Sequence, residues 1–171
     1  RVNAYQPVHG TAHMPSWTQF WEGYRLLFAE AKLVTCTESV VMAVVDGAGP
    51  AAPCGCGRRS IRLTPSGTIL PCVYWPRPAG TLAQAVESSG AIFDGPEFVA
   101  ARALPGGCAD CELLDRCGGG CPARRTLVGT PDEPDPYCPF RGAEFPVIAV
   151  RAGADRDLLH AANVCTTIVE A

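Results

Sequence analysis

Apolar residues recur at helical spacing near the start of the chain. The segment Ser16-Trp17-Thr18-Gln19, which follows Pro15, has the form of a capping box and predicts a helix start. Behind it, apolar side chains return every three or four positions, which predicts one strongly amphipathic helix whose apolar stripe faces a core. The stripe consists of Trp17, Phe20, Trp21, Tyr24, Leu27, Phe28 and Ala31.

Two stretches on either side of this helix have the character of strands. Residues 1–9 alternate apolar and polar side chains and predict a strand that ends at Gly10. The run SVVMAVV over residues 39–45 is short and continuously apolar, which predicts a buried strand. Strand, helix and strand together form a βαβ unit, from which parallel barrels and open sheets are built.

The pattern changes after residue 51. Strand-like segments flank Pro65-Ser66-Gly67, which predicts a β-hairpin in which Gly67 supplies the positive φ of the turn. Cys72 lies five positions beyond Gly67, so the hairpin determines where that thiol points.

Further along, two capping boxes predict short helices over residues 82–88 and 97–104; they are Thr81 with Gln84 and Asp94 with Glu97. Residues 105–141 are rich in Gly, Pro and Cys and show little periodicity, so we expect metal ligation to order them. Residues 142–171 predict a tail of strand and short helix. The fold class expected is therefore α+β.

Composition limits the possible functions. A chain of 171 residues with 47% hydrophobic and 18% charged residues can bury a core. Its formal charge of −3 and scattered arginines give no reason to expect a nucleic-acid or anionic-membrane partner. No apolar run approaches the roughly 20 residues that span a bilayer.

Ten cysteines make the composition unusual. An even number allows disulfides, but the N-terminus shows no basic-then-apolar signal segment. In a reducing cytoplasm, which is the location we expect, clustered thiols more often ligate metal. Cys36 and Cys165 lie in apolar runs and are expected to be small buried side chains.

The other eight cysteines form a pattern that two kinds of metal centre can explain. They are Cys54, Cys56, Cys72, Cys108, Cys111, Cys117, Cys121 and Cys138. Structural zinc sites usually use C-x2-C knuckles, and only Cys108 and Cys111 have that spacing. Iron–sulfur clusters are larger and accept more varied spacings, so the spacing favours clusters over zinc. Glycines 118–120 would let the backbone approach such a cluster closely, and their N–H groups could donate to its sulfurs.

This pattern resembles the SPASM domain, the C-terminal extension of many radical S-adenosylmethionine enzymes that modify peptides and proteins. The matching residues are Cys54 or Cys56, then Gly67 and Cys72, then CADCELLDRCGGGC from Cys108 to Cys121, then Cys138. The resemblance implies two auxiliary 4Fe–4S clusters with interlaced ligands. Cluster I would take Cys54, Cys56, Cys72 and Cys121, and cluster II would take Cys108, Cys111, Cys117 and Cys138. Either both Cys54 and Cys56 bind, or one is a bystander and an iron stays open for substrate.

The resemblance also implies a domain organisation. Residues 51–141 would be the SPASM domain, residues 1–50 the end segment of a radical S-adenosylmethionine partial (β/α) barrel, and residues 142–171 a C-terminal tail. Gln6 and His9 end the first predicted strand and are candidates for the cofactor side of that barrel, although a loop without a role explains them as well.

A C-x3-C-x2-C triplet, which the catalytic cluster of these enzymes needs, is absent from the chain. We therefore expect a fragment that is not catalytically competent alone. A missing N-terminal half would hold S-adenosylmethionine and a third 4Fe–4S cluster, with a peptide or protein substrate and an external electron donor as partners. The alternative is a zinc-stabilised, Cys-rich peptide-binding module without redox activity.

A four-iron cluster with four thiolates carries a net charge of about −2, which the formal charge of the chain omits. Several arginines stand beside the predicted ligands and would either offset this charge or simply be solvated. They are Arg58, Arg59, Arg116, Arg124 and Arg125.

Overall fold

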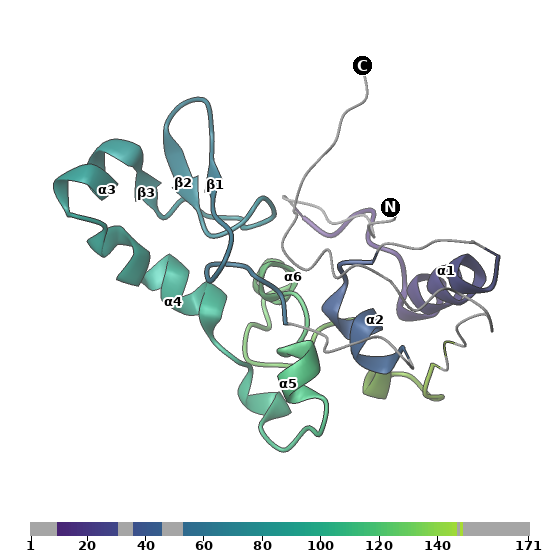
Figure 1. Cartoon of the computed structure of the whole chain (residues 1–171). Coiled ribbons are helices and arrows are strands. Elements are labelled where there is room, and N and C mark those ends of the chain that lie inside the picture. The colour runs from purple at the N-terminus through teal and green to yellow at the C-terminus, as the bar shows by residue number, and fades with distance from the viewer. Residues whose placement is uncertain (1–9, 31–35, 46–52, 147, 149–171) are drawn as a thin grey trace, which may run out of the picture.

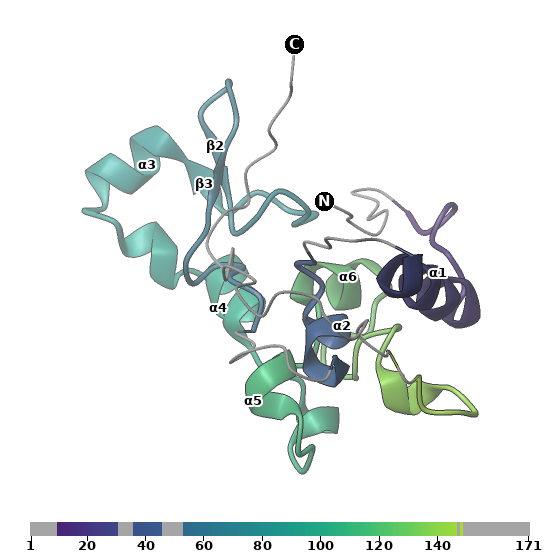
Figure 2. The same cartoon turned by 45° about the vertical axis from the view of Figure 1, so that its right-hand side comes forward.

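The computed structural model describes residues 10–30, 36–45, 53–146 and 148, and the α+β class predicted from the sequence is confirmed (Figure 1). A small sheet lies with α3 and α4 on one side of the molecule, while α1 and α2 lie on the other, with α5 and α6 between them (Figures 1 and 2). The predicted first strand, with Gln6 and His9, and the predicted tail beyond residue 148, with Cys165, lie outside the described residues.

The first helix forms as predicted. Helix α1 spans Trp17–Glu30 and buries Phe20, Trp21 and Tyr24. Its capping box is present in both directions: the Ser16 N–H donates to Gln19 Oε1 at 2.9 Å, and the Gln19 N–H donates to Ser16 Oγ at 3.2 Å. These bonds satisfy N–H groups that a helix start otherwise leaves without a partner.

The strand predicted over residues 39–45 is wrong, because this run forms helix α2 (Ser39–Val44). A short, fully apolar run carries no periodicity that separates a buried helix from a buried strand. The neighbour of α2 is helix α5 (Leu114–Cys117), and Arg116 Nη2 of α5 donates to the Met42 carbonyl at 3.3 Å. The second strand of the predicted βαβ unit therefore does not exist.

The predicted hairpin is confirmed. Strands β1 (Arg62–Leu63), β2 (Thr68–Leu70) and β3 (Gly80–Thr81) form an antiparallel sheet in that order. Gly67 has a φ of +80°, and its N–H donates to the Thr64 carbonyl at 2.9 Å. This turn brings the chain back so that Cys72 follows β2 after one intervening residue.

Of the two short helices predicted after the hairpin, one starts as expected and one does not. Helix α3 (Leu82–Glu87) has the predicted capping box of Thr81 and Gln84. Helix α4 (Pro96–Arg102) is capped by Gly95, while Asp94 belongs to the preceding short helix η1 (Ala91–Asp94). The predicted box of Asp94 and Glu97 is wrong, because Pro96 moves the helix start and Glu97 bonds Trp75 and Arg77 instead.

Residues 105–141 contain four short helical elements: η2 (Gly106–Cys108), α5, α6 (Pro122–Leu127) and η3 (Pro139–Arg141). This segment also contributes to a core that its sequence did not reveal. The Tyr137 ring stacks on Phe20 with ring centroids 4.0 Å apart, and its hydroxyl donates to the Pro15 carbonyl at 2.8 Å. Trp17 and Trp21 donate from their indole N–H groups to the carbonyls of Cys138 and Tyr137. Helix α1 is thus fixed to the cysteine-rich segment.

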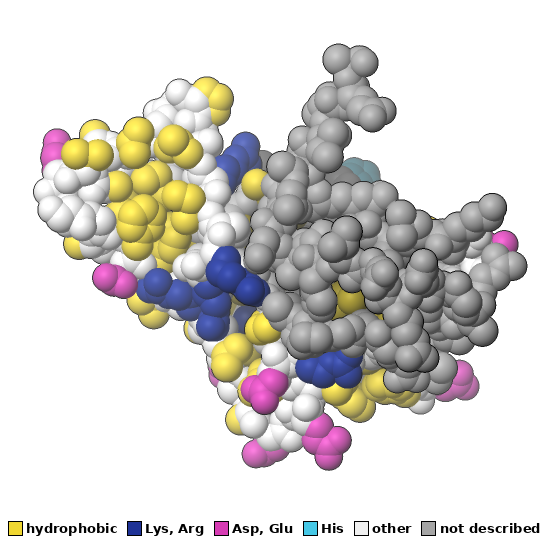
Figure 3. Space-filling view, viewed as in Figure 1, with side chains coloured by type: hydrophobic (Ala, Val, Ile, Leu, Met, Phe, Trp, Pro, Cys, Tyr) yellow, Lys and Arg dark blue, Asp and Glu magenta, His cyan; other side chains and the backbone are white. Residues whose placement is uncertain are grey.

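On the surface, apolar side chains gather over the sheet and α3, and acidic side chains surround α5 (Figure 3). Helix α3 exposes Leu82 and Val86. Among the described helices, none combines the length and the apolar character needed to cross a bilayer.

Candidate metal centre

The first group of thiols joins three distant parts of the sequence. Cys54, Cys56, Cys72 and Cys121 pack together around Trp75, Ala101 and Ala123. The loop that carries Cys54 and Cys56 folds tightly, since the Gly55 carbonyl accepts the backbone N–H groups of residues 58, 59 and 60. The Gly57 N–H donates to the Pro71 carbonyl at 2.9 Å and holds this loop beside Cys72. Both thiols of the Cys54-Gly55-Cys56 sequence are therefore in the group.

Hydrogen bonds distinguish the thiols of this group. Cys56 donates its S–H to Cys72, and this bond lowers the pKa of Cys72 and raises that of Cys56. The Tyr74 backbone N–H also donates to Cys72 Sγ, at 3.4 Å. Burial raises the pKa of Cys54 and of Cys121. Cys72 is the member of the group best prepared to be a thiolate.

Cys121 belongs to this first group although in sequence it lies between Cys117 and Cys138 of the second group. It is the N-cap residue of α6, and its backbone N–H donates to Asp135 Oδ2 at 2.7 Å. Its side chain packs with Cys54, Cys56 and Cys72. The structure thus packs together the four thiols that the resemblance assigns to one cluster.

The second group lies beside a small pocket that is partly open at the surface. Cys108, Cys111, Cys117 and Cys138 all line it. Val40 and Ala43 of α2 also line it, so the helix that replaces the predicted strand contributes to the wall of the pocket. Short turns hold the backbone at all four cysteines, because their N–H groups donate to carbonyls three or four residues earlier.

Burial favours the protonated form of three thiols of the second group, those of Cys108, Cys117 and Cys138. It raises the pKa of Cys117 to about 12, and it also raises the pKa values of Cys108 and Cys138. Metal binding to such thiols must release protons, since the thiolate is the ligand. All nine described cysteines are free thiols.

Glycines 118–120 connect the two groups, and the structure adds a reason for them that the sequence did not reveal. All three have positive φ values, between +63° and +82°. A Cβ atom would lie 2.6 Å from Pro53 at Gly118, 2.4 Å from Pro105 at Gly119 and 2.3 Å from Asp135 at Gly120. The N–H groups of Gly118 and Gly120 donate to the carbonyls of residues 114 and 117. The glycines therefore make room for other parts of the chain, and these two N–H groups are already occupied.

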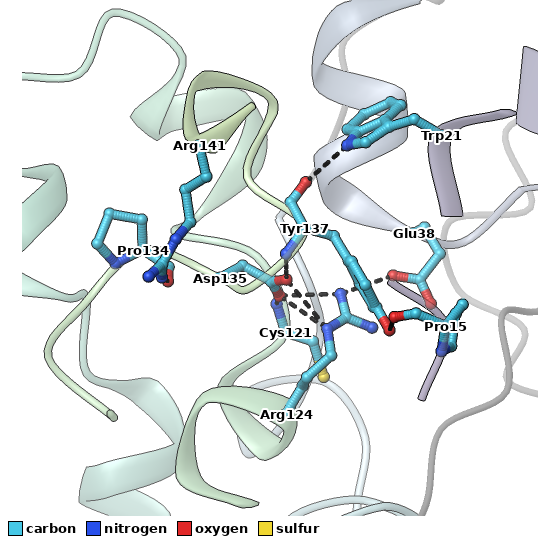
Figure 4. Close-up of polar contacts among 9 residues, drawn as sticks. All are labelled: Pro15, Trp21, Glu38, Cys121, Arg124, Pro134, Asp135, Tyr137 and Arg141. Atoms are coloured by element: carbon cyan, nitrogen blue, oxygen red, sulfur yellow. Dashed lines mark hydrogen bonds and ion pairs between the residues drawn. The ribbon is translucent and has the colours of Figure 1, made fainter. Parts of the chain in front are cut away.

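Arg124, Asp135 and Glu38 form a buried ion-pair network next to Cys121 (Figure 4). This network was not predicted from the sequence. Arg124 binds both carboxylate oxygens of Asp135, with Nη2 2.9 Å from Oδ2 and Nε 3.0 Å from Oδ1. Nη2 also lies 3.1 Å from Glu38 Oε2. Its guanidinium stands over the Tyr137 ring at 4.7 Å. Nothing in the sequence pairs Glu38 with Arg124, because the contact depends on tertiary structure alone.

The arginines beside the predicted ligands differ in their surroundings. Arg58 and Arg59 are exposed and donate to the carbonyls of residues 102 and 53. Arg116 donates to α2, and Arg124 is paired with two carboxylates. Arg125 is buried and, within the part of the chain that the structure describes, donates to backbone carbonyls alone.

The donor chemistry of both groups fits a thiolate-ligated iron–sulfur cluster, because each group contains four cysteine thiols, which are the usual ligands of such clusters. As the described side chains stand, no three of His, Cys, Asp or Glu are close enough together to hold a single metal ion. Thiolates around a four-iron cluster stand further apart than those around one zinc ion, since the cluster itself separates them.

Cys36 lies outside both groups. It packs against the core of α1 and α2, as expected for a small apolar side chain, and burial raises its pKa to about 12.

Comparison of the chain with protein-family models, curated proteins and solved structures found no match.

Proposed function

We propose that the chain is the C-terminal region of a radical S-adenosylmethionine enzyme that modifies peptides or proteins, and that it binds two auxiliary 4Fe–4S clusters. The observation that carries the proposal is the grouping of eight thiols into two sets of four. The sets have the same interlaced membership that the SPASM resemblance implies.

In this proposal, residues 51–141 form the cluster-binding domain. Cys54, Cys56, Cys72 and Cys121 would hold cluster I, and Cys108, Cys111, Cys117 and Cys138 would hold cluster II. A bound 4Fe–4S cluster supplies one-electron transfer and, with an open iron, substrate contact. Residues of the chain would orient the ligands, through the Tyr74 N–H at Cys72 and through Asp135 at Cys121.

The rest of the enzyme would lie upstream, in a partial barrel that binds S-adenosylmethionine and a third 4Fe–4S cluster. Gln6 and His9 are the proposed cofactor-side residues of this chain. A peptide or protein substrate and an external electron donor would be the partners, and a reducing cytoplasm would keep the thiols available.

Anaerobic reconstitution of the full chain with iron and sulfide tests the proposal. We expect about eight irons and eight sulfides per chain, with the broad visible absorption of two 4Fe–4S clusters. Binding of about two zinc ions without sulfide uptake would reject the proposal in favour of a zinc-stabilised peptide-binding module. Cys36→Ser is the matched control and should leave the iron content unchanged, because Cys36 belongs to neither group.

A further inference from the structure

Arg125 is a buried cation without a carboxylate partner among the described residues. Only 2% of the residue is exposed. Nη2 donates to the Ala103 carbonyl at 3.1 Å, and Nη1 donates to the Pro131 carbonyl. Its Nε is buried and finds no hydrogen-bond acceptor in the described part of the chain. None of the ion pairs between described residues includes Arg125.

The neighbouring arginine shows that this arrangement is unusual within the molecule. Arg124 is equally buried, but it is paired with Asp135 and Glu38. Carbonyl groups solvate a guanidinium without neutralising it, so the charge of Arg125 has no direct ion-pair partner among the described residues. Burial accordingly lowers the pKa of Arg125. A buried unpaired charge is unfavourable, so a fold that retains one needs an anion nearby.

The position of Arg125 indicates where this anion would lie. Arg125 stands one helical turn after Cys121 on α6, and its N–H donates to the Cys121 carbonyl at 3.1 Å. The guanidinium reaches the Ala103 carbonyl, at the start of the loop that leads to Cys108. Asp135, Cys121, Cys108 and Asp132 are the groups whose negative charge would favour the Arg125 cation. Two of these four are proposed ligands, one from each cysteine group.

We propose that Arg125 is the internal counter-cation of the two clusters and makes them easier to reduce. The inference rests on the proposed function. Each reduction takes one electron from an external one-electron donor and adds one negative charge to the cluster, with no bond made or broken. A buried cation nearby stabilises the more negative, reduced form, and net charge is one of the factors that set cluster potentials.

The test compares Arg125→Gln with Arg125→Lys in the reconstituted full chain, by redox titration followed by electron paramagnetic resonance, with dithionite as the reductant. Gln keeps a donor for the carbonyls but removes the charge, whereas Lys keeps the charge. We expect the clusters of Arg125→Gln to bind the electron at least tenfold more weakly than those of wild type, which corresponds to a midpoint potential lower by about 59 mV. The midpoint potential of Arg125→Lys should shift less, because the charge is kept. Arg58→Gln is the control, because Arg58 also donates to a carbonyl but is exposed, and its midpoint should not change.

Equal midpoints for wild type and Arg125→Gln at equal iron content would overturn the inference and leave the proposed function standing. Failure of the wild type to take up iron and sulfide would overturn both. If Arg125→Gln does not take up iron and sulfide, the stability of the iron-free variant compared with that of the iron-free wild type tests the inference instead. Because the substitution removes a buried charge that has no direct ion-pair partner among the described residues, the iron-free variant should be no less stable than wild type, and a lower denaturation midpoint would contradict the inference.

Discussion

Asp135 contacts Cys121 through its side chain, whose Oδ2 accepts the Cys121 backbone N–H at 2.7 Å. Its own backbone carbonyl accepts the N–H of Cys138 at 2.8 Å. One residue therefore fixes a thiol of the first group and a thiol of the second. The same carboxylate binds Arg124, so the position of both thiols depends on one buried ion pair.

Replacing Asp135 with Asn should destabilise the iron-free protein strongly. The change leaves Arg124 buried with Glu38 as its remaining carboxylate, and removing one partner of a buried ion pair costs about 3–5 kcal/mol. Chemical denaturation measures the loss. Glu133→Gln is the control, because its ion pair with Arg141 is exposed, and the change should cost less than about 0.5 kcal/mol. Similar losses for the two variants would contradict the role given to Asp135.

Single serine substitutions should separate the two thiol groups. Cys121→Ser should impair the first cluster and leave the second loaded, whereas Cys117→Ser, four residues earlier, should do the reverse. Iron and sulfide analysis with Mössbauer or electron paramagnetic resonance spectroscopy distinguishes the two losses. If both variants lost the same cluster, the interlaced assignment would be wrong.

Much of the local structure could be predicted, because local structure depends on neighbours in sequence. Helix α1, the hairpin at Gly67 and the capping box of Thr81 all follow from such patterns. The state of residues 39–44 could not be predicted, since an apolar run becomes a helix or a strand according to what packs on it. The pairing of Arg124 with Glu38 was hidden for the same reason.

For the cysteine groups, too, one part could be predicted from the sequence and another could not. Sequence spacing suggested eight ligands, and only the resemblance divided them into two sets. The glycines before Cys121 could be noticed in the sequence, but their close neighbours, Pro53, Pro105 and Asp135, could not, because these come from distant positions in the chain. Sequence spacing therefore identifies candidate cysteines and glycines, while the tertiary contacts give the physical reason for each glycine.

Glu97 should make the stability of the protein depend on pH. Its carboxylate accepts the Trp75 indole N–H at 2.7 Å and the Arg77 Nε–H at 2.9 Å. Burial alone would raise the pKa of Glu97, but the bonds from Arg77 and Trp75 outweigh it, so the pKa is lowered. A lowered carboxyl pKa stabilises the folded state above the unfolded value of about 4.3, and this contribution is lost as the pH falls through the folded pKa.

Glu97→Gln should therefore reduce the free energy of unfolding by about 1 kcal/mol at neutral pH. The difference from wild type should shrink steadily below about pH 4. Denaturant midpoints of the two proteins across this range measure it. Glu87→Gln, which alters an exposed carboxylate, should show little difference at any pH. A gap between Glu97→Gln and wild type that stayed constant down to low pH would show that the charge of Glu97 is not responsible.

Gly120 and Gly129 offer a matched test of the junction between the thiol groups, because both have a φ of +82°. An alanine at either position pays for the left-handed backbone, which costs about 1–2 kcal/mol. At Gly129 the new Cβ meets nothing within 4 Å, whereas at Gly120 it would lie 2.3 Å from Asp135 Cβ and 2.4 Å from Oδ2. Overpacking of this kind adds about 1–3 kcal/mol.

Gly120→Ala should therefore lower the free energy of unfolding by more than Gly129→Ala does. It should also reduce the iron content after reconstitution, because moving Asp135 releases the Cys121 N–H and disturbs the turn that holds Cys138. Gly129→Ala should load iron like wild type, although it too is less stable. Denaturation and iron analysis of the same two preparations separate backbone strain from displacement of Asp135. Equal iron loading at unequal stability would mean that Asp135 supports the fold without positioning the thiols.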